Sequence, residues 1–450
     1  MTGPSSPDAP LVVAVEMGYG HLRAALPIAE ALGVPLLPAD REPLARPDEK
    51  ALWDRLRRAY ELTSRLSQLP VAGGPLRLLL DQLTDIPSLY SGRDLSAPTR
   101  TARWIERLAR RGLGRGMVEE LRASRRPLLT TFFVPAIVAD RVGLESEIFC
   151  VATDTDVNRA WAPVDAGRTR IRYLVPTRRV AKRLVRYGVP EARITFTGFP
   201  LPHELLGGPG LPALRRNLAR RLVRLDPRRA FRGETGGDVA SFLGPLPAEE
   251  EGRPPLLTFA VGGAGAQADL ARRFLPSLRP AILEGGLRLA LVAGVKPAVR
   301  ATLEECVAEA RLEQAPGLEI LFDEDLPGYF RRFNELAART DVLWTKPSEL
   351  TFFAALGLPV ICAPPVGVHE QRNRRWVRES GAGMKQRDPA FAADWLADML
   401  ADGQLAAAAW AGYVRLPKSG LYRILEEVRG LPRVPAEPRE PLATGTARDR

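Results

Sequence analysis

Two stretches of this chain, one near its start and one past its middle, share the same order of an apolar run, a glycine-bearing turn and a helical pattern. Residues 11–16 read LVVAVE, a continuous apolar run typical of a buried strand, and MGYGH and LRAALPIAEALG follow it. Residues 256–275 read LLTFAVGGAGAQADLARRFL and repeat that order. Shorter strand-like runs alternate with helical runs after each opening. The sequence therefore predicts an α/β protein of two halves, each built on a parallel sheet.

The domain boundaries follow from where this alternation stops and restarts. With 450 residues, of which 45% are hydrophobic, the chain is long enough to bury two cores. The stretch 51–126 is expected to be mostly helical, 214–232 to be a basic helix with a leucine stripe, 233–255 to be loop and about 390–428 to be a tail helix. We therefore expect a Rossmann-like domain over 1–202, a basic helical insertion or linker over 203–255, a second Rossmann-like domain over 256–430 and a disordered tail over 431–450.

Charge and cysteine content narrow the class of protein. Lys and Arg number 64 against 53 Asp and Glu, a net charge of +11, which favours anionic partners. Nucleic acid is not expected, because no aromatic-interleaved basic motif accompanies the arginines. Cys150, Cys306 and Cys362 are odd in number and far apart, which excludes a disulfide framework and a cysteine zinc motif and favours the reducing cytoplasm. The first residues lack a basic signal-peptide region, and no apolar run is long enough to span a bilayer.

The first turn carries a candidate base. Gly18 and Gly20 at a strand-to-helix turn let the backbone approach a ligand, and the helix start offers N–H groups to an anion. His21 lies at that rim, where a neutral imidazole can take a proton from a hydroxyl near pH 7. The spacing does not match the dinucleotide-binding fingerprint. A capping or packing histidine is the alternative.

Three later segments place polar residues where predicted strands end, and ligands of open α/β sheets bind beyond those ends. The turn 261–267 is small enough for a diphosphate, although a turn that binds nothing fits it too. Glu349 is placed to hydrogen-bond a ribose diol, or Ser348 and Glu349 cap a helix. After the strand-like run ending near Cys150, two aspartates and an amide could orient His21 or an acceptor, could bind a hard metal ion, or could be a polar loop. The residues of this last segment are Asp154, Asp156, Asn158 and Trp161.

In order, these motifs resemble glycosyltransferases of the two-Rossmann-domain (GT-B) type, and especially the monogalactosyldiacylglycerol synthase and peptidoglycan lipid I N-acetylglucosaminyltransferase group. GYGHLRAA is similar to that group's Gly-Gly-Gly-His turn, and IFCVATDTDVNRAW with RYLVPTRRVAKRLVRYGVPEARITFTGFPL resembles the end of its N-terminal domain. GGAGAQ and TKPSEL…GLP…HEQRN look like its donor half. The likeness covers about 11–25, 145–202 and 256–385. Phe352 stands where the relatives carry an acidic ribose-binding residue, and Asn158 where the synthases tend to carry His.

The resemblance implies two facing domains, with the acceptor bound by the N-terminal one and a nucleotide-diphosphate sugar, UDP-linked, bound by the C-terminal one. His21 is then the catalytic base, and Gly18, Gly20, Asp154, Asp156, Asn158 and Trp161 line the acceptor side. Inverting transfer to a hydroxyl is expected, with no metal and no cofactor. The donor is held by Gly262, Gly263, Gly265, Gln267, Thr345, Lys346, Ser348, Glu349, His369, Glu370, Gln371 and Asn373.

The acceptor and two rival functions stay open at this point. A lipid acceptor and peripheral contact with the anionic inner face of the membrane would use the basic leucine-striped helices, although those stripes also fit ordinary core faces. A sugar-nucleotide epimerase shares the fold. A catalytically silent GT-B protein that only binds nucleotide is the third possibility.

Overall fold

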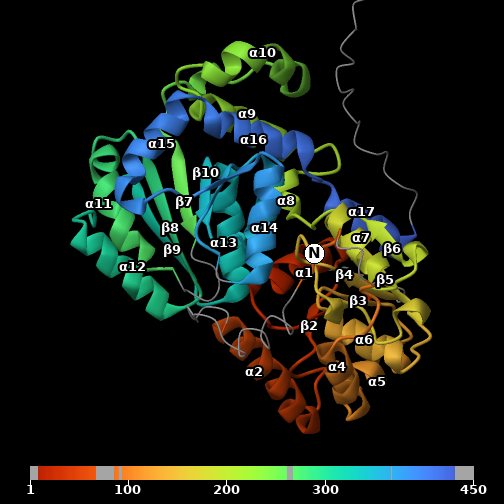
Figure 1. Cartoon of the computed structure of the whole chain (residues 1–450). Helices are drawn as coiled ribbons and strands as arrows, with labels where there is room; N and C mark the ends of the chain where they lie inside the picture. Colours follow the sequence, from red (N-terminus) through yellow and green to blue (C-terminus); the bar gives the residue numbers. More distant parts are fainter. Residues whose placement is uncertain (1–8, 67–85, 91–93, 261–266, 366, 431–450) are drawn as a thin grey trace, which may run out of the picture.

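The computed structural model describes residues 9–66, 86–90, 94–260, 267–365 and 367–430. Figure 1 shows two lobes side by side, each with a central sheet between helices. All strand pairs in both sheets are parallel. The predicted α/β architecture of two Rossmann-like domains, the GT-B fold, is therefore confirmed.

The N-terminal sheet has the strand order β2-β1-β3-β4-β5-β6. Its strands are short and almost wholly apolar, and the four residues of β1 are at most 2% exposed, as expected for strands covered on both faces. The strands of this sheet are β1 (Leu11–Ala14), β2 (Leu36–Pro38), β3 (Leu128–Thr130), β4 (Ile148–Val151), β5 (Ile171–Val175) and β6 (Ile194–Phe196). Its helices are α1 (Tyr19–Leu32), α2 (Lys50–Leu66), α4 (Arg100–Arg110), α5 (Arg115–Ser124), α6 (Phe133–Arg141) and α7 (Arg178–Arg186), with short 3₁₀ turns η1 (Pro47–Glu49), η2 (Arg159–Trp161), η3 (Ala166–Arg168) and η4 (Glu191–Arg193).

The C-terminal sheet has the order β12-β11-β10-β7-β8-β9. Counted from β7, this is the 3-2-1-4-5-6 order of dinucleotide-binding folds. Its strands are β7 (Leu256–Ala260), β8 (Arg288–Gly294), β9 (Leu318–Phe322), β10 (Val342–Thr345), β11 (Val360–Cys362) and β12 (Gly383–Lys385). Its helices are α11 (Leu270–Leu283), α12 (Pro297–Glu309), α13 (Leu326–Arg339), the 3₁₀ helix η6 (Glu349–Leu356), α14 (Val368–Glu379), η7 (Pro389–Phe391), α15 (Ala392–Ala401), α16 (Gln404–Arg415) and α17 (Gly420–Arg429).

The insertion differs from its prediction in where helix and loop fall. It forms α8 (His203–Leu206), α9 (Pro212–Arg224), α10 (Ala230–Leu243) and the 3₁₀ turn η5 (Ala248–Glu250). The single helix expected over 214–232 is interrupted because Pro227 follows Asp226, whose carboxylate accepts hydrogen bonds from the backbone N–H groups of Phe231 and Arg232 at the start of α10. Helix α10 occupies residues that we expected to be loop.

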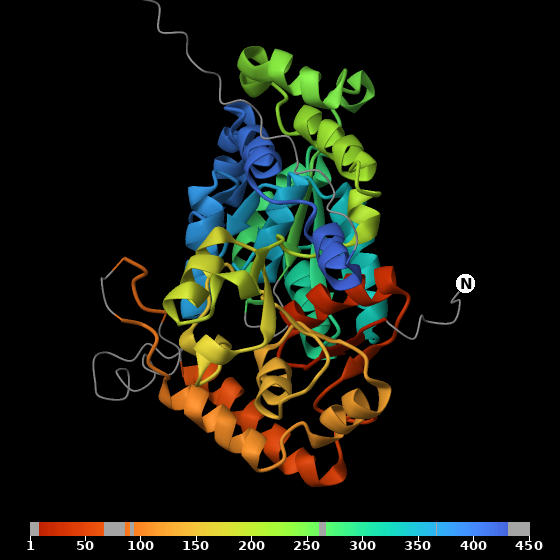
Figure 2. The ribbon, with the colours of Figure 1, turned by 90° about the vertical axis from the view of Figure 1, so that its right-hand side faces the viewer.

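The leucine stripe of α9 is a core face. Leu214, Leu218, Leu222 and Leu225 are each at most 1% exposed and belong to the larger hydrophobic core, which contains the strands of the C-terminal sheet and extends to α1. Of the two interpretations of this stripe, the structure supports packing within the protein. The insertion lies over the C-terminal lobe at the top of the molecule (Figure 2).

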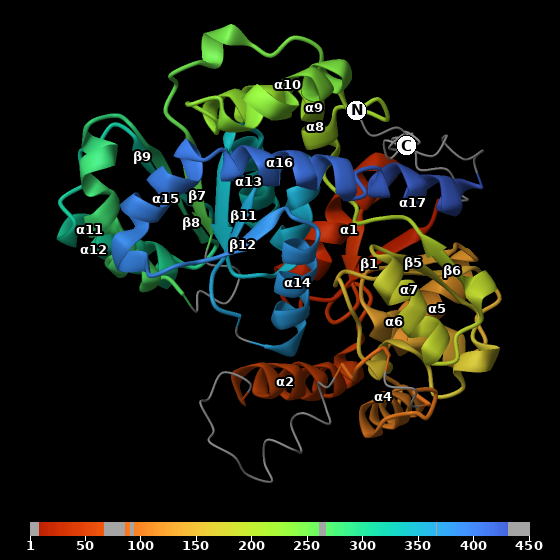
Figure 3. The same ribbon diagram turned by 45° about the horizontal axis from the view of Figure 1, so that its top comes forward.

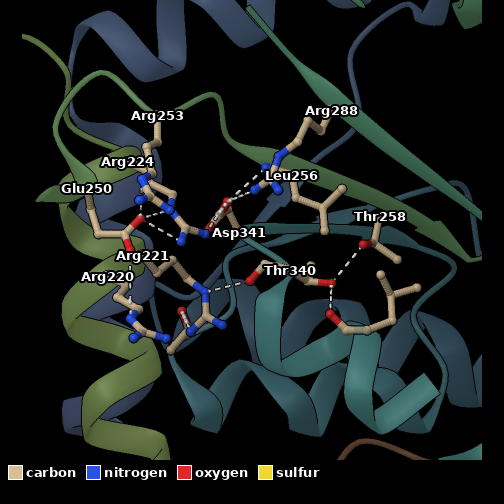
Figure 4. A network of polar contacts seen from close by, with 12 residues as sticks. Arg220, Arg221, Arg224, Glu250, Arg253, Leu256, Thr258, Arg288, Thr340 and Asp341 are labelled. Atoms are coloured by element: carbon tan, nitrogen blue, oxygen red, sulfur yellow. Dashed lines mark hydrogen bonds and ion pairs between the residues drawn. The ribbon is translucent and has the colours of Figure 1, made fainter. Parts of the chain in front are cut away.

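A buried polar network joins α9 to the base of the C-terminal sheet (Figure 4). Arg221, 2% exposed, donates to the backbone oxygens of Thr340, Leu356 and Gly357 at 2.9 to 3.1 Å. Arg224 pairs with both Glu250 and Asp341, and Asp341 also accepts from the N–H of Leu256, the first residue of β7. Buried ion pairs and hydrogen bonds, as well as apolar packing, therefore attach the insertion to the C-terminal lobe.

The end of the described chain returns to the N-terminal lobe. The tail expected as one helix is three, α15 to α17, and Pro417 follows α16 where a helix could not continue. In Figure 3, α16 lies over the C-terminal lobe and α17 over the N-terminal one. Arg429 of α17 donates to the backbone oxygen of Ala31 in α1, and Glu427 pairs with Arg172 of β5 at 2.8 Å. The last helix of the C-terminal segment, α17, therefore contacts the N-terminal lobe.

Candidate functional site

The candidate site lies where the carboxyl ends of strands from both sheets meet. In the N-terminal sheet, β1 and β3 are neighbours but their connections leave toward opposite sides, which makes their ends a topological switch point. The corresponding pair in the C-terminal sheet is β7 and β10. His21 follows β1, and Lys346 follows β10. The strand order, and not the chain order, brings these segments together.

His21 is held in one orientation by the loop after β3. Its Nδ1 lies 2.7 Å from the backbone oxygen of Thr131 and 3.1 Å from Oγ1 of Thr153, and the hydroxyl of Thr131 donates back to the His21 backbone oxygen. Because a carbonyl oxygen only accepts, Nδ1 of the neutral ring carries the proton and Nε2 keeps its lone pair. The imidazole is therefore set up to accept a proton at Nε2.

The surroundings of His21 favour its neutral form. The residue is 8% exposed, and the rings of Phe132 and Trp161 lie 4.8 and 6.5 Å from the imidazole between ring centroids. Burial lowers the pKa of His21 below its ordinary value, while the carboxylate of Asp154 opposes that shift. A neutral imidazole at pH 7 is the form that a general base requires.

Gly18 and Gly20 allow the first turn of α1 to approach the other lobe. Gly18 has a φ of 110°, a conformation that side-chain-bearing residues rarely adopt, and it caps α1. A Cβ on Gly20 would lie 3.4 Å from Cβ of Glu349, the first residue of η6. Glu349, at the start of η6 in the C-terminal lobe, therefore lies against the helix that carries His21.

A second set of contacts crosses between the lobes through the loop after β4. The side-chain oxygen of Asn373 on α14 accepts from the backbone N–H and the hydroxyl of Thr155, at 3.1 and 2.7 Å. Its amide nitrogen lies 3.5 Å from Asp154, and His369 Nδ1 lies 3.9 Å from the same carboxylate. The structure therefore brings Asp154, His369 and Asn373 together. Asn373 is 1% exposed, and its side-chain oxygen is already bonded to Thr155.

The polar residues that follow β7, β10 and β11 hold one another in place. Lys346 Nζ pairs with Glu370 Oε1 at 2.7 Å. Thr345 is buried and donates to the backbone oxygen of Ala260 at the end of β7, while Gln267 donates to that of Pro364. Ser348 Oγ has no hydrogen-bond partner among the described residues. The predicted diphosphate-binding glycines Gly262, Gly263 and Gly265 lie outside the described residues.

Three predicted acceptor residues have structural partners instead of an open side chain. Asp156, 1% exposed, forms a two-bond ion pair with Arg183 at 2.8 and 2.9 Å, so its carboxylate is engaged within the N-terminal lobe. Asn158 caps the short helix η2 through the N–H of Ala160. Trp161 is buried beside His21. Gln371, which we expected to bind the donor, is exposed on α14.

Phe352 stands where the related glycosyltransferases carry an acidic residue, and its surroundings are apolar. Phe352 is 2% exposed and stacks on Phe199, with ring centroids 4.4 Å apart and an interplanar angle of 7°. Nothing at this position can bind a ribose diol.

Sequence reasoning missed several residues that contact the candidate base or its helix. Thr131 follows a predicted strand in the run LLTTFF, and a hydroxyl residue at a strand end was the available signal. Thr153 lay inside the motif singled out for its aspartates. Arg23 lies inside the motif GYGHLRAA, but nothing local indicates its contacts, because its partners are about 300 residues away. Within the described ranges, no three His, Cys, Asp or Glu side chains converge as a metal site would require, and no helix is long and apolar enough to cross a membrane.

Comparison with known proteins agrees with the motifs. No family model matches the chain. It is 25% identical over 283 residues to a processive diacylglycerol beta-glucosyltransferase of Bacillus mycoides (strain KBAB4), a stretch that is 61% of this chain and 60% of the relative. The chain thus matches less than two thirds of that relative's length. The resemblance to GT-B glycosyltransferases is confirmed.

Solved structures with a similar arrangement include UDP-GlcNAc 2-epimerase of Neisseria meningitidis bound to UDP-GlcNAc, at 11% identity and a TM-score of 0.46 over 93% of this chain and 99% of that chain. MurG of Acinetobacter baumannii aligns at 13% identity and a TM-score of 0.48 over the same shares. These scores support no statement about the activity of this chain.

Proposed function

We propose that this protein is a glycosyltransferase that moves a sugar from a nucleotide-diphosphate sugar, UDP-linked, to a hydroxyl acceptor. The observation that carries the proposal is the placement of the His21 imidazole at the switch point of the N-terminal sheet, with Nδ1 bonded to the Thr131 carbonyl and a pKa lowered by burial, which leaves Nε2 to accept a proton. The likeness to a diacylglycerol beta-glucosyltransferase supports the same class of reaction.

In the proposed step, Nε2 of His21 takes the proton of the acceptor hydroxyl while the oxygen forms a bond to the anomeric carbon. The bond from that carbon to the nucleotide diphosphate breaks on the opposite face, so the configuration inverts and the diphosphate leaves with the bonding electrons. Thr131 and Thr153 keep the ring oriented during the transfer. General-base assistance of this kind contributes about 10²–10⁴-fold to the rate.

The leaving diphosphate gains negative charge and needs positive partners. Lys346, which follows β10 and pairs with Glu370 with 14% of its side chain exposed, is the cation that we assign to this role. Gly262, Gly263 and Gly265 precede α11 in the sequence, and we assign the backbone N–H groups of this segment to the diphosphate. Stabilisation by these groups does not require a metal ion in the proposed mechanism.

We propose a lipid hydroxyl as acceptor and contact with an anionic membrane surface. The relative's name includes diacylglycerol. On α4, the exposed Arg100, Arg103 and Arg107 lie on one face, opposite the buried face of Ala102, Ile105 and Leu108, and the exposed Arg111 caps the end of the helix. Such a basic face is attracted by about 1 kcal/mol per residue to an anionic leaflet. Flotation with phosphatidylglycerol vesicles at low salt tests this contact, and failure to float would contradict it.

The function is tested by a thermal-shift screen of sugar nucleotides, followed by product analysis with and without a diacylglycerol acceptor. A nucleotide sugar present at 100 times its Kd stabilises the native state by about 2.7 kcal/mol. We expect one UDP-sugar to stabilise the protein and to be consumed only with acceptor present. Conversion of the sugar nucleotide without acceptor would indicate an epimerase, binding without turnover would indicate a silent protein, and either result would contradict transfer.

A further inference from the structure

Helix α1 lies between the two lobes and contacts each with a different face. His21 points to the N-terminal lobe, where it bonds to Thr131. Arg23, two residues later and therefore roughly 200° around the helix, points to the C-terminal lobe. Tyr19, one turn before Arg23, joins it there and packs on Tyr329 and Phe330 of α13. The proposed base and a cross-lobe contact thus share one rigid helix.

Arg23 enters a box of aromatic rings that belongs to the C-terminal lobe. Its guanidinium carbon lies 4.4 Å from the ring centroid of Phe333 and 4.5 Å from that of Phe330, and Tyr329 and Phe353 are within 5.7 Å. Nη2 donates to the hydroxyl of Tyr329 at 3.3 Å. Burial raises the pKa of Tyr329 to about 12, so this phenol stays neutral and cannot balance the charge.

Glu349 is the charged partner of Arg23. Its Oε1 lies 3.5 Å from Nε of Arg23, and the two side chains are 12% and 2% exposed. Among the described residues, Nε and Nη1 of Arg23 have no hydrogen bond. A buried cation with unfilled donors has lost much of its hydration, a cost that filling the aromatic pocket by volume alone would not require. The charge therefore needs a reason beyond packing.

We propose that Arg23 is a positioning residue: its guanidinium attaches α1, and with it His21, to the C-terminal lobe and fixes the carboxylate of Glu349 beside Gly20. The cation–π contacts supply the attachment, since a desolvated guanidinium over aromatic rings is strongly bound. The contact with Glu349 supplies the register between α1 and η6. As far as it concerns catalysis, this inference rests on the proposed function, but the attachment itself does not.

Amide hydrogen exchange of α1 in the substrate-free protein tests the attachment. Arg23→Met keeps the length and apolar stem, and Arg23→Lys keeps the charge. We expect α1 amides to exchange about tenfold faster in the Met variant and near the wild-type rate in the Lys variant. Arg332→Met is the control. Arg332 is an exposed residue of α13 that pairs with Asp323, and its replacement should leave the exchange rate of the α1 amides unchanged. Unchanged exchange in Arg23→Met would overturn the proposal.

Glu349→Gln completes a double-mutant cycle and covers the case in which Arg23→Met does not fold. It should also speed α1 exchange, and adding it to Arg23→Met should cause little further change. Additive effects, or no effect of Glu349→Gln, would overturn the coupling. In turnover assays we expect Arg23→Met to lower kcat about tenfold and to change the donor KM less, because His21 is misplaced. If no transferase activity exists, only this last measurement fails, and the exchange results still decide.

Discussion

The backbone oxygen of Thr131 lies 2.7 Å from Nδ1 of His21 and determines which nitrogen of the imidazole carries the proton. The two residues are 110 positions apart, yet two hydrogen bonds join them, one donated by His21 Nδ1 and one by the Thr131 hydroxyl. A main-chain carbonyl cannot be protonated or rotated away as a side chain can. The orientation of the proposed base is thus built into the sheet.

Replacement of His21 by Ala should lower turnover by about 10²–10⁴-fold and leave the far-UV circular dichroism unchanged. Thr153→Val removes one acceptor from Nδ1 while the Thr131 carbonyl remains, so its loss of turnover should be smaller. Thr302→Val, which removes a hydroxyl on the exposed face of α12, is the matched control. Full activity in His21→Ala would remove this residue from the mechanism.

The stability of the protein should carry a pH dependence that comes from His21. Burial lowers the pKa of His21 in the folded state below the value of about 6.5 that it has in the unfolded chain. Below that pH the unfolded chain binds the proton first, so the free energy of unfolding falls as pH falls through 6.5 and through the folded-state pKa, and is fully retained above 6.5. Urea denaturation between pH 5 and 8 measures this. In His21→Asn the acid-side loss should shrink, and parallel curves for the two proteins would contradict the assignment.

Asn373 should stabilise the contact between the lobes. Asn373→Ala leaves the N–H and hydroxyl of Thr155 without their acceptor in a buried position, which should cost about 1–3 kcal/mol in the free energy of unfolding. Gln371→Ala, exposed on the same helix, should change stability by less than about 0.5 kcal/mol. Equal effects of the two substitutions in urea denaturation would show that the cross-lobe bond contributes nothing.

The parts of the fold that the sequence predicts are those set by local pattern. Continuous apolar runs followed by glycine turns predict parallel strands, and these are present in both lobes. The pattern also predicts that polar residues at strand ends gather, and His21 and Asp154 do so. It does not predict strand order, which depends on pairing between distant segments. For the same reason it does not predict the ion pair of Asp156, because the Arg183 that binds this carboxylate lies on a later helix.

The residues that join the lobes, and the helix α10 in the insertion, were the hardest to predict. Arg23 follows a leucine on an amphipathic helix and looks like a solvent-facing residue until the aromatic rings of α13 are placed against it. Helix α10 contains three glycines, which argue for loop, and its start is fixed by the carboxylate of Asp226. In both cases a tertiary contact outweighs the local preference.

Arg224 should be essential to the attachment of the insertion. Arg224→Met leaves the carboxylates of Glu250 and Asp341 buried without their shared cation, and breaking a buried pair from one side typically costs about 3–5 kcal/mol. Arg220, on the same helix but 46% exposed and 3.7 Å from Glu250, is the control, and its replacement by Met should cost at most about 1 kcal/mol. Equal unfolding midpoints for the two variants in urea would contradict this ranking.

The docking of α17 onto the N-terminal lobe should depend on the absence of a side chain at Gly420. A Cβ there would lie 2.2 Å from the backbone oxygen of Phe199, closer than any real contact, and backbone cannot move aside cheaply. Gly420→Ala should therefore destabilise by about 1–3 kcal/mol and increase proteolysis near Pro417, as α17 detaches. Gly237→Ala in α10, where a Cβ meets open space, should have the opposite sign and stabilise by about 0.5–1 kcal/mol. If both substitutions stabilise the protein, the close approach of α17 to Phe199 does not exist in solution.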